Sequence, residues 1–469
     1  MDTTRVQAWP GIVGGVLADD PDRFEDFETY RGRGGYDALS SPDLICQRLS
    51  ANPSVHALHG RGGASYPYWR KVVAARAAGI EQRLAPVVAA NGAEGEPLSV
   101  KDRYLMRHRP HLVLDGLALS AAAVGAEHAY VYVADELSRR AMEKAIYEAS
   151  GLLGCNVKIA IAQDTYVAGE SSALVRSVQT GTARPVDGPP RPHHVGIGSV
   201  PTVVSNVETL ARVARSLQPA PAADDEVFLV TISGPAAESA VVEVPQGLSV
   251  AELLRSVGHL AAPPEKAAST AVLAGGFFGG VLPVATDLVV SWDSFAQHGG
   301  GLGCASLYVI PDVDDVMPVA AQVATYYAHN TAGQCRTCLN ATRDVAHHLT
   351  NEAPPTGHIK SLGGDAMEEI TRWGTQLVGR GACAVPDGVA LLLSSLLLHY
   401  PDQLAAHVEL MAATRRTSAL LPVRQAEWKS HTKAMAEAIP PVPVPVAAGA
   451  DGLPSADPVQ EFETMEVPS

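Results

Sequence analysis

The chain has 469 residues, of which 46% are hydrophobic and 18% charged, and its formal net charge is -15. This length exceeds what one hydrophobic core usually organises, so we expect two or three globular domains. An acidic chain without a basic stripe is unsuited to a polyphosphate backbone, which excludes nucleic acid as an expected partner.

Two stretches bear on cellular location. The beginning of the sequence lacks the basic and apolar segments of a secretory signal. The apolar run from Gly388 to Tyr400 is too short to span a bilayer and reads as a buried helix. We therefore expect a cytoplasmic protein that is not integral to a membrane, whose six cysteines are thiols or metal ligands.

Strand-like and helix-like segments alternate in the first half of the chain. The expected strands span 84–90, 128–134 and 156–162, and the expected helices span 110–126 and 136–150. This alternation predicts an α/β domain with a parallel sheet, whose binding loops lie at the carboxyl ends of the strands.

The second half changes character. A stretch rich in proline and alanine reads as a linker at 219–226. Short apolar segments with one helix-like stretch then predict a compact β-rich domain, and a helical region follows. The proline-rich, acidic end is expected to be disordered. The expected divisions are 1–222, 223–312, 313–421 and 422–469.

A glycine-rich loop begins at Gly60 with Gly-Arg-Gly-Gly, and the same four residues occur earlier, beginning at Gly32. Glycines let backbone N–H groups approach a phosphate closely, and arginine or lysine adds positive charge. The same four residues also fit an ordinary surface turn, so the choice between a turn and a phosphate-binding loop depends on the other motifs of the chain.

Three companions follow the loop. An acidic turn spans 91–103, a second turn spans 164–174, and a strand-to-helix junction lies at 200–210. By themselves these segments fit a solvated turn and a helix N-cap.

Cys335 and Cys338 form a CxxC pair that fits an iron–sulfur site, a zinc half-site, a redox dithiol or no site at all.

Together these motifs resemble the NADH-binding flavoprotein subunit of respiratory complex I and its relatives in NAD-linked hydrogenases and formate dehydrogenases. The resemblance runs from about Gly11 to Leu410. It implies an α/β fold with a Rossmann-like FMN-binding domain, a β-grasp domain of the SLBB type, and a C-terminal helical bundle that binds an iron–sulfur cluster. It assigns the copy at Gly32 a structural role.

The resemblance also implies the residues that bind the cofactor. They are Gly60, Arg61, Gly62, Gly63, Lys71, Asn91, Glu94, Glu96, Tyr166, Gly169, Glu170, Ser205, Asn206 and Thr209. The implied metal ligands are Cys335, Cys338 and Cys383.

The family pattern supplies four cysteines to a [4Fe–4S] cluster, whereas this chain has Ala332 at the first position. Three options remain open for the missing ligand. In the first, the cluster is a [3Fe–4S] form. In the second, water or another residue such as His329 binds the fourth iron of a cubane. In the third, Cys304 replaces the missing cysteine.

Further departures concentrate where the resemblance places the nicotinamide nucleotide. Ser171, Gly188, Arg191 and Ala74 replace a carboxylate, a lysine and two aromatic residues of the family. Each lost stacking partner removes about 1 kcal/mol, so NADH binding is expected to be weak, although NAD(P)H stays the implied donor. Arg191 either meets the 2′-phosphate of NADPH or lies exposed in a proline-rich loop.

The sequence therefore predicts an NADH dehydrogenase-like oxidoreductase subunit that passes electrons between FMN and an iron–sulfur cluster. A ferredoxin-like or [2Fe–2S] subunit is the implied partner. Two alternatives remain: a ferredoxin-linked electron-transfer subunit that has lost NADH binding, and a structural scaffold of a redox complex.

Overall fold

The computed structural model describes residues 4–12, 15–17, 23–218, 226–260, 269–350 and 365–414. The segment expected to be disordered, 422–469, lies outside these ranges. Four helices precede the first sheet in the sequence: α1 (Phe27–Gly32), α2 (Pro42–Ser50), α3 (Pro53–Ala57) and α4 (Tyr68–Gln82).

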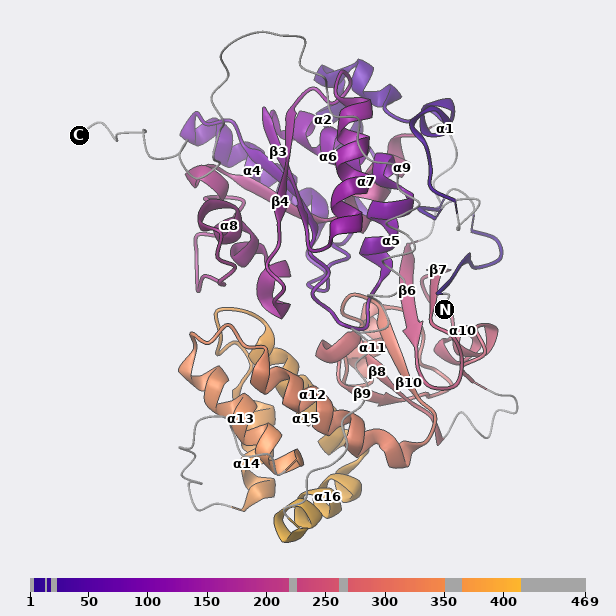
Figure 1. The fold of residues 1–469 in the computed structure, drawn as a ribbon, viewed down its shortest axis with the longest axis vertical. Coiled ribbons are helices and arrows are strands. Elements are labelled where there is room, and N and C mark those ends of the chain that lie inside the picture. Colours follow the sequence, from indigo (N-terminus) through magenta and orange to yellow (C-terminus); the bar gives the residue numbers. More distant parts are fainter. Residues whose placement is uncertain are drawn as a thin grey trace, which may run out of the picture. The chain divides into compact units, whose positions relative to one another are not determined.

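A parallel four-stranded sheet lies at the centre of the first half of the chain, with the strand order β4-β3-β2-β5 (Figure 1). Its strands are β2 (Val87–Gly92), β3 (His128–Val133), β4 (Asn156–Ile161) and β5 (Thr202–Asn206). Its helices are α5 (Lys101–His108), α6 (Pro110–Val124), α7 (Glu136–Ala149), α8 (Ser171–Thr180) and α9 (Val207–Leu217). The predicted α/β fold with a parallel sheet is confirmed.

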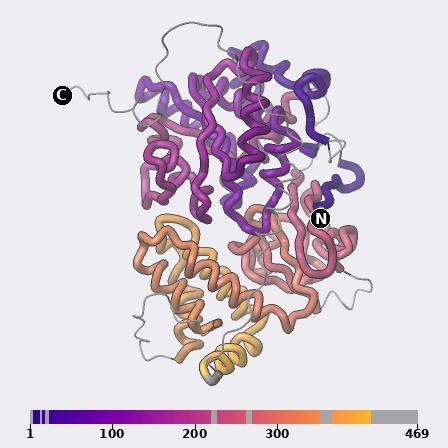
Figure 2. The backbone as a smooth tube through the Cα atoms, in the orientation of Figure 1, coloured from indigo at the N-terminus to yellow at the C-terminus, as the bar shows by residue number. Residues whose placement is uncertain are grey.

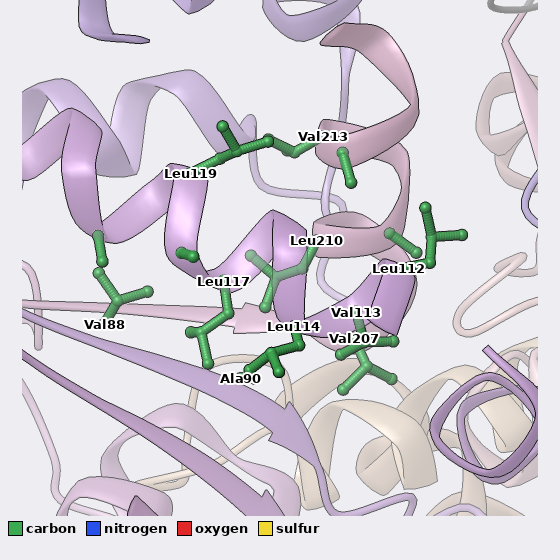
Figure 3. Packing of buried hydrophobic residues seen from close by; sticks show 14 of the residues in the cluster. Val88, Ala90, Leu112, Val113, Leu114, Leu117, Leu119, Val207, Leu210 and Val213 are labelled. Atoms are coloured by element: carbon green, nitrogen blue, oxygen red, sulfur yellow. The ribbon is translucent and has the colours of Figure 1, made fainter. Parts of the chain in front are cut away.

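The core of this region lies between α6, α9 and the sheet. Figure 3 shows side chains of α6 and α9 gathered over Val88 and Ala90 of β2. The two helices approach closely at Gly116, where an added Cβ would lie 1.9 Å from the carbonyl oxygen of Leu210. Each leucine buried here contributes about 1.5–3 kcal/mol, so this packing fixes α9 and the strand ends beside it.

A second sheet has six strands in the order β1-β7-β6-β10-β8-β9. Its strands are β1 (Arg5–Ala8), β6 (Val227–Ser233), β7 (Ala240–Pro245), β8 (Ala271–Ala274), β9 (Val281–Pro283) and β10 (Ser306–Ile310), accompanied by α10 (Val250–Ser256) and α11 (Trp292–Gln297).

The first strand of this sheet comes from the beginning of the chain (Figure 2). β1 pairs in parallel with β7, with Arg5 opposite Ala240. The first domain expected from the sequence spans 1–222, so it includes β1 together with the four-stranded sheet. A short strand that pairs with a partner more than 200 residues away leaves no local signal of that partner, since periodicity reports only burial.

Five helices follow: α12 (Val316–His329), α13 (Arg336–Thr350), α14 (Ala366–Gln376), α15 (Val385–His399) and α16 (Pro401–Thr414). They share a hydrophobic core that extends to Phe277 beside β8 and to Val167 beside α8. This confirms a helical carboxyl-terminal region. Among the helices that the structure describes, none combines the length and apolar character needed to cross a bilayer.

Candidate functional site

The glycine-rich loop connects α3 to α4. The N–H of Gly60 donates to the carbonyl oxygen of Tyr66 at 3.0 Å, which closes the loop on itself. Gly63 has φ +104°, a conformation in which a Cβ is strained. The loop therefore keeps a tight backbone path that few other sequences could follow.

The loop lies against the amino terminus of α9. The N–H of Arg61 donates to Thr209 Oγ1 at 3.0 Å, and an added Cβ on Gly62 would lie 3.3 Å from Cβ of Asn206. Asn206 caps the helix, since its Oδ1 accepts from the N–H of Glu208 at 3.0 Å. A glycine loop beside a helix amino terminus favours a phosphate group.

Lys71 adds a positive charge beside this helix end. Its Nζ donates to the carbonyl oxygen of Val204 in β5 at 3.2 Å and lies 5.7 Å from the ring centre of Tyr66. Burial lowers the pKa of Lys71. Ser205 follows Val204 and is buried, so its hydroxyl is held inside the strand end.

The guanidinium of Arg61 points away from the loop. It lies 4.2 Å from the ring centre of Phe228 and 4.9 Å from that of Trp292. Its Nη2 is 3.3 Å from Glu226. The resemblance places this charge on the flavin phosphate, whereas the structure packs it between two aromatic rings of the second-sheet region, where it already has a carboxylate partner.

A buried ion network continues from Arg61. Glu208 is its hub and contacts Lys101 Nζ at 3.0 Å and Arg212 Nη2 at 2.8 Å. Arg212 also pairs with Glu243 of β7 at 3.2 Å. Burial alone would raise the pKa of Glu208, yet Lys101, Arg212 and Arg61 hold it at about 2. The network joins the glycine loop to the six-stranded sheet.

The acidic turn after β2 contains two carboxylates with different roles. Glu94 accepts from the N–H groups of Asp102 at 3.1 Å and Arg103 at 3.2 Å, so it caps the amino terminus of α5. Asn91 Nδ2 donates to the carbonyl oxygen of Gly169 at 2.7 Å. Both side chains hold the turn in place, a role that the sequence could not separate from cofactor binding.

Glu96 is the second carboxylate. The residue as a whole is partly buried, but its carboxyl group is enclosed and accepts from Tyr166 Oη at 3.3 Å and the N–H of Phe277 at 3.1 Å. Burial raises the pKa of Glu96 to about 8. This side chain can therefore hold a proton at neutral pH, at a point where the chain's sheets and helices meet.

Tyr166 joins three parts of the chain. Its ring stacks on Phe278 at 5.0 Å between centroids and meets Tyr326 and Tyr327 of α12 edge-on. These rings pack against the hydrophobic cluster of the helical region, which contains Cys338 and against which Cys335 and Cys383 also pack. Tyr166 and the three cysteines therefore border the same core.

Glu170 caps α8 by accepting from the N–H groups of Ser172 and Ala173, both at 2.9 Å. Its charge also raises the pKa of Cys383, after the larger effect of burial. Gln334 donates to the carbonyl oxygen of Pro185 at 2.6 Å. These contacts bring the α8 region beside the cysteine-containing loops.

The three predicted metal ligands lie near one another. Burial and then the charges of Cys383 and Cys335 raise the pKa of Cys338 to about 12. Cys335 directly precedes α13, and Cys383 lies two residues before α15. The N–H of Ala382 donates to Cys335 Sγ at 3.4 Å. Hydrogen bonds to sulfur are typical of iron–sulfur sites, so these residues fit such a cluster.

A single metal ion has no such site. Within the described ranges, no three or more His, Cys, Asp or Glu side chains form a group that could hold one.

Cys304 lies beside the glycine-rich loop. Its backbone N lies 3.8 Å from where a Cβ on Gly63 would be, and its thiol is 3.9 Å from the carbonyl oxygen of Gly275. Burial raises the pKa of the Cys304 thiol, and the charge of Glu96 raises it further. His329 is exposed and bonds to the carbonyl oxygen of Thr325.

The glycine-rich loop at the amino terminus of α9 suits a flavin phosphate, and Cys335, Cys338 and Cys383 suit an iron–sulfur cluster. Together they indicate an electron-transfer protein, and the comparisons with known proteins agree. Residues 55–215 match the Nuo51 FMN-binding domain, and residues 318–407 match the NADH-ubiquinone oxidoreductase-F iron-sulfur binding region.

The F 2 subunit of NADH-quinone oxidoreductase from Rhizobium meliloti strain 1021 is 32% identical over 415 residues, which cover 81% of this chain and 94% of that protein. The F subunit of the enzyme from Aquifex aeolicus is 29% identical, with 86% and 94% covered. The crystal structure of an air-oxidized NAD+-reducing [NiFe]-hydrogenase shares the fold at a TM-score of 0.64 and 23% identity, over 89% of this chain and 72% of that one.

The chain belongs to the family of the flavoprotein subunit of NADH-quinone oxidoreductase. The predicted family and the predicted function are confirmed: it is an NADH dehydrogenase-like oxidoreductase subunit that uses FMN and an iron–sulfur cluster for electron transfer.

Sequence reasoning missed the ion network and the position of Cys304. Lys101, Glu208 and Arg212 are scattered over 100 residues, and only the fold brings them together. The i,i+4 spacing of Glu208 and Arg212 on α9 was the one local signal available.

Proposed function

We propose that the chain accepts a hydride equivalent from NAD(P)H at FMN and delivers single electrons to a cluster held by Cys335, Cys338 and Cys383. The observation that carries this proposal is one hydrophobic cluster that contains Cys338 and against which Tyr166, Cys335 and Cys383 pack. FMN, when bound, exchanges two electrons with a hydride donor and one electron at a time with a metal cluster.

The residues of the chain have distinct roles in this proposal. The loop at Gly60–Gly63, the α9 amino terminus and Lys71 hold the flavin phosphate. Asn91, Glu94, Gly169 and Glu170 maintain the turns around it. Glu96 holds a proton on its carboxyl group and accepts from Tyr166 Oη, so it can release that proton when the charge beside it changes.

The two sheets and the helical region are consistent with three domains. We infer an FMN-binding domain that is Rossmann-like, a β-grasp domain of the SLBB type around β6–β10, and a helical bundle around α12–α16. Because β1 completes the second sheet, the first of these domains begins after it. A ferredoxin-like or [2Fe–2S] subunit and a cytoplasmic location complete the proposal.

Anaerobic mixing with NADH or NADPH tests the donor. Bleaching of the flavin absorbance by either nucleotide supports the proposal, and a flavin that only dithionite reduces contradicts it. Iron analysis and low-temperature EPR test the cluster. With three cysteine ligands and Ala332 at the fourth position, one iron of a [4Fe–4S] cluster has no thiolate ligand, so we expect the cluster to convert readily to a [3Fe–4S] form. A stable cubane with four protein ligands would contradict the open corner.

A further inference from the structure

A short turn before β5 carries three side chains that can be cationic. It spans residues 191–194 and contains Arg191, His193 and His194. The N–H of His194 donates to the carbonyl oxygen of Arg191 at 2.8 Å, which closes the turn. The rings of the two histidines lie 4.6 Å apart between centroids. Groups of like charge are therefore held together on one short piece of backbone.

The backbone of this turn is fixed by two other elements. The carbonyl oxygen of Pro192 accepts from the N–H of Thr202 in β5 at 2.7 Å. At the end of α4, Gln82 Nε2 donates to the carbonyl oxygen of His194 at 3.1 Å. An added Cβ on Gly196 would lie 2.3 Å from Thr202 Oγ1, so the chain after the turn also packs closely on β5. A fixed backbone lowers the ordering cost when the side chains of the turn bind a ligand.

The turn lies beside the glycine-rich loop. The ring of His193 stacks on that of Tyr66, with centroids 6.4 Å apart and planes inclined by 23°. Tyr66 belongs to the loop, because its carbonyl oxygen accepts from the N–H of Gly60 at 3.0 Å. The ring of Tyr66 is 5.7 Å from Lys71 Nζ. A molecule bound at the turn is therefore next to the loop to which the proposed function assigns FMN.

The cationic groups of the turn lack a carboxylate partner. Within the described ranges, the guanidinium of Arg191 forms no hydrogen bond or ion pair, and neither do the imidazole nitrogens of His193 and His194. Burial lowers the pKa of His193, and the neighbouring cationic groups, His194 first, lower it further. The turn thus gathers positive charge that the protein does not compensate, and a bound anion would compensate it.

The donors of the turn suit a phosphate monoester. Such a group carries about 1.5–2 negative charges at pH 7 and offers three terminal oxygens. The guanidinium of Arg191 and both imidazoles can donate to these oxygens, and hydrogen bonds between charged partners are short and strong. Of the two fates expected for Arg191, the structure shows the exposed one. An exposed guanidinium without a protein partner is available to such a ligand.

We propose that the turn at 191–194 binds the 2′-phosphate of NADPH, so that the chain uses NADPH in preference to NADH, an inference that rests on the proposed function. The two nucleotides differ only in this phosphate monoester on the adenosine half, and an arginine accommodates it in other NADP sites. Lys71 keeps its role toward FMN. The turn acts on affinity, because it is the nicotinamide half that has to meet the flavin.

The test compares NADPH with NADH on two variants that remove the same charge. Arg191→Ala alters the turn, and Arg176→Ala alters an exposed position on α8. Bleaching of the flavin in the holoprotein is followed by stopped flow under argon at increasing nucleotide concentrations. We expect the wild type to have an apparent Kd about tenfold lower for NADPH than for NADH.

The variants should separate affinity from the rate of reduction. Arg191→Ala should raise the apparent Kd for NADPH about tenfold and that for NADH about twofold or less, and Arg176→Ala should change neither by more than about twofold. The limiting rate of bleaching should be the same in all three proteins, because the turn does not contact the reacting atoms. Equal flavin content verifies that the glycine-rich loop is intact.

Binding without hydride transfer provides the second criterion. Adenosine 2′,5′-bisphosphate carries the phosphate in question and 5′-AMP lacks it, and neither reduces a flavin. In calorimetry we expect the wild type to bind the bisphosphate about tenfold more tightly than 5′-AMP, and Arg191→Ala to bind the two within about twofold of each other. His193→Gln should lower the preference about threefold.

An equal loss of affinity for NADH and NADPH in Arg191→Ala would assign the turn to the pyrophosphate that both nucleotides share and would overturn the inference. Equal effects of Arg191→Ala and Arg176→Ala would also overturn it. A wild type that binds NADH as tightly as NADPH overturns it too, although bleaching by NADH leaves the proposed function intact. If the bisphosphate binds through Arg191 but neither nucleotide bleaches the flavin, the phosphate site is upheld and the proposed function fails.

Discussion

Two segments of the chain share the sequence Gly-Arg-Gly-Gly and differ in everything around it. In the segment at Gly32–Gly35, the side chain of Arg33 is 43% exposed and its Nη1 lies 3.4 Å from Glu25. In the segment at Gly60–Gly63, the side chain of Arg61 is 3% exposed and lies between two aromatic rings.

The glycines differ in the same way. An added Cβ on Gly35 would lie 2.2 Å from Cε1 of Tyr30, a buried ring, so this glycine serves internal packing. Gly62 is exposed and faces Asn206 at the start of a helix. The proposed binding role therefore belongs to the segment that has a helix amino terminus and a lysine beside it, and the same four residues at Gly32–Gly35 lack both.

The arginines should separate the two segments most clearly. Arg61→Ala removes one member of a buried ion network and leaves Glu208 and Glu226 with less compensation, so we expect a loss of about 3–5 kcal/mol in unfolding free energy and a lower flavin content. Arg33→Ala should cost about 1 kcal/mol or less. Denaturant unfolding and flavin released per chain measure both.

Arg61→Lys sharpens this prediction. Lysine keeps the charge but cannot stack as a planar group between Phe228 and Trp292, so it should restore only part of the stability. Equal losses in the Arg33 and Arg61 variants would break the distinction between the segments.

The glycines should show the opposite pattern for stability and for binding. Gly35→Ala forces a contact with Tyr30, whose hydroxyl is fixed by Asp115 at 2.7 Å, so we expect about 1–3 kcal/mol of destabilisation and unchanged flavin affinity. Gly62→Ala should leave the unfolding midpoint close to that of the wild type and weaken flavin binding severalfold. Fluorescence titration of the apoprotein with FMN checks the affinity.

Two buried carboxyl groups have a raised pKa and should respond differently to pH: Glu96, and Asp115, which accepts from the N–H of Tyr36 directly after the Gly32–Gly35 segment. Burial raises the pKa of Glu96 to about 8 and that of Asp115 to about 6. Both folded values exceed the unfolded ones, so the folded chain binds more protons and its stability falls as pH rises. The stability contributed by each protonated group is lost between about pH 4.5 and 8 for Glu96 and between about pH 4 and 6 for Asp115.

Between pH 6 and 8 the contribution of Glu96 to stability falls steeply, whereas most of the Asp115 contribution is already lost by pH 6. Glu96→Gln should therefore flatten the loss of stability across that interval, and Asp115→Asn should retain the slope of the wild type. Thermal midpoints of the apoprotein at several pH values provide the measurement. A Glu96→Gln slope equal to that of the wild type would show that this carboxyl group does not carry the proton.

The smallest effect is expected from Cys304→Ser. Its thiol lies 3.9 Å from the carbonyl oxygen of Gly275 and its backbone N faces Gly63, so iron content and the EPR signal should stay unchanged, and flavin affinity should change by about twofold or less. Loss of iron in this variant would make Cys304 a cluster ligand and would contradict its placement beside the flavin loop.

Local sequence patterns predicted much of the first fold region and the general place of the cofactors. The apolar strands β2, β3 and β4 and the helices between them follow from periodicity, because each element buries one face or stripe. The fate of Arg61 could not follow in this way, since Phe228 and Trp292 lie more than 160 residues further along the chain. Glu94 likewise needed the turn into α5 to be seen as a cap.

The pairing of β1 with β7 has a consequence for how the protein is made. A ribosome adds about 5–20 residues per second, so Arg5 emerges tens of seconds before its partner Ala240 exists. β1 therefore has no partner strand until β7 has been synthesised, and its unpaired backbone groups are accessible during that time to a chaperone that binds extended segments.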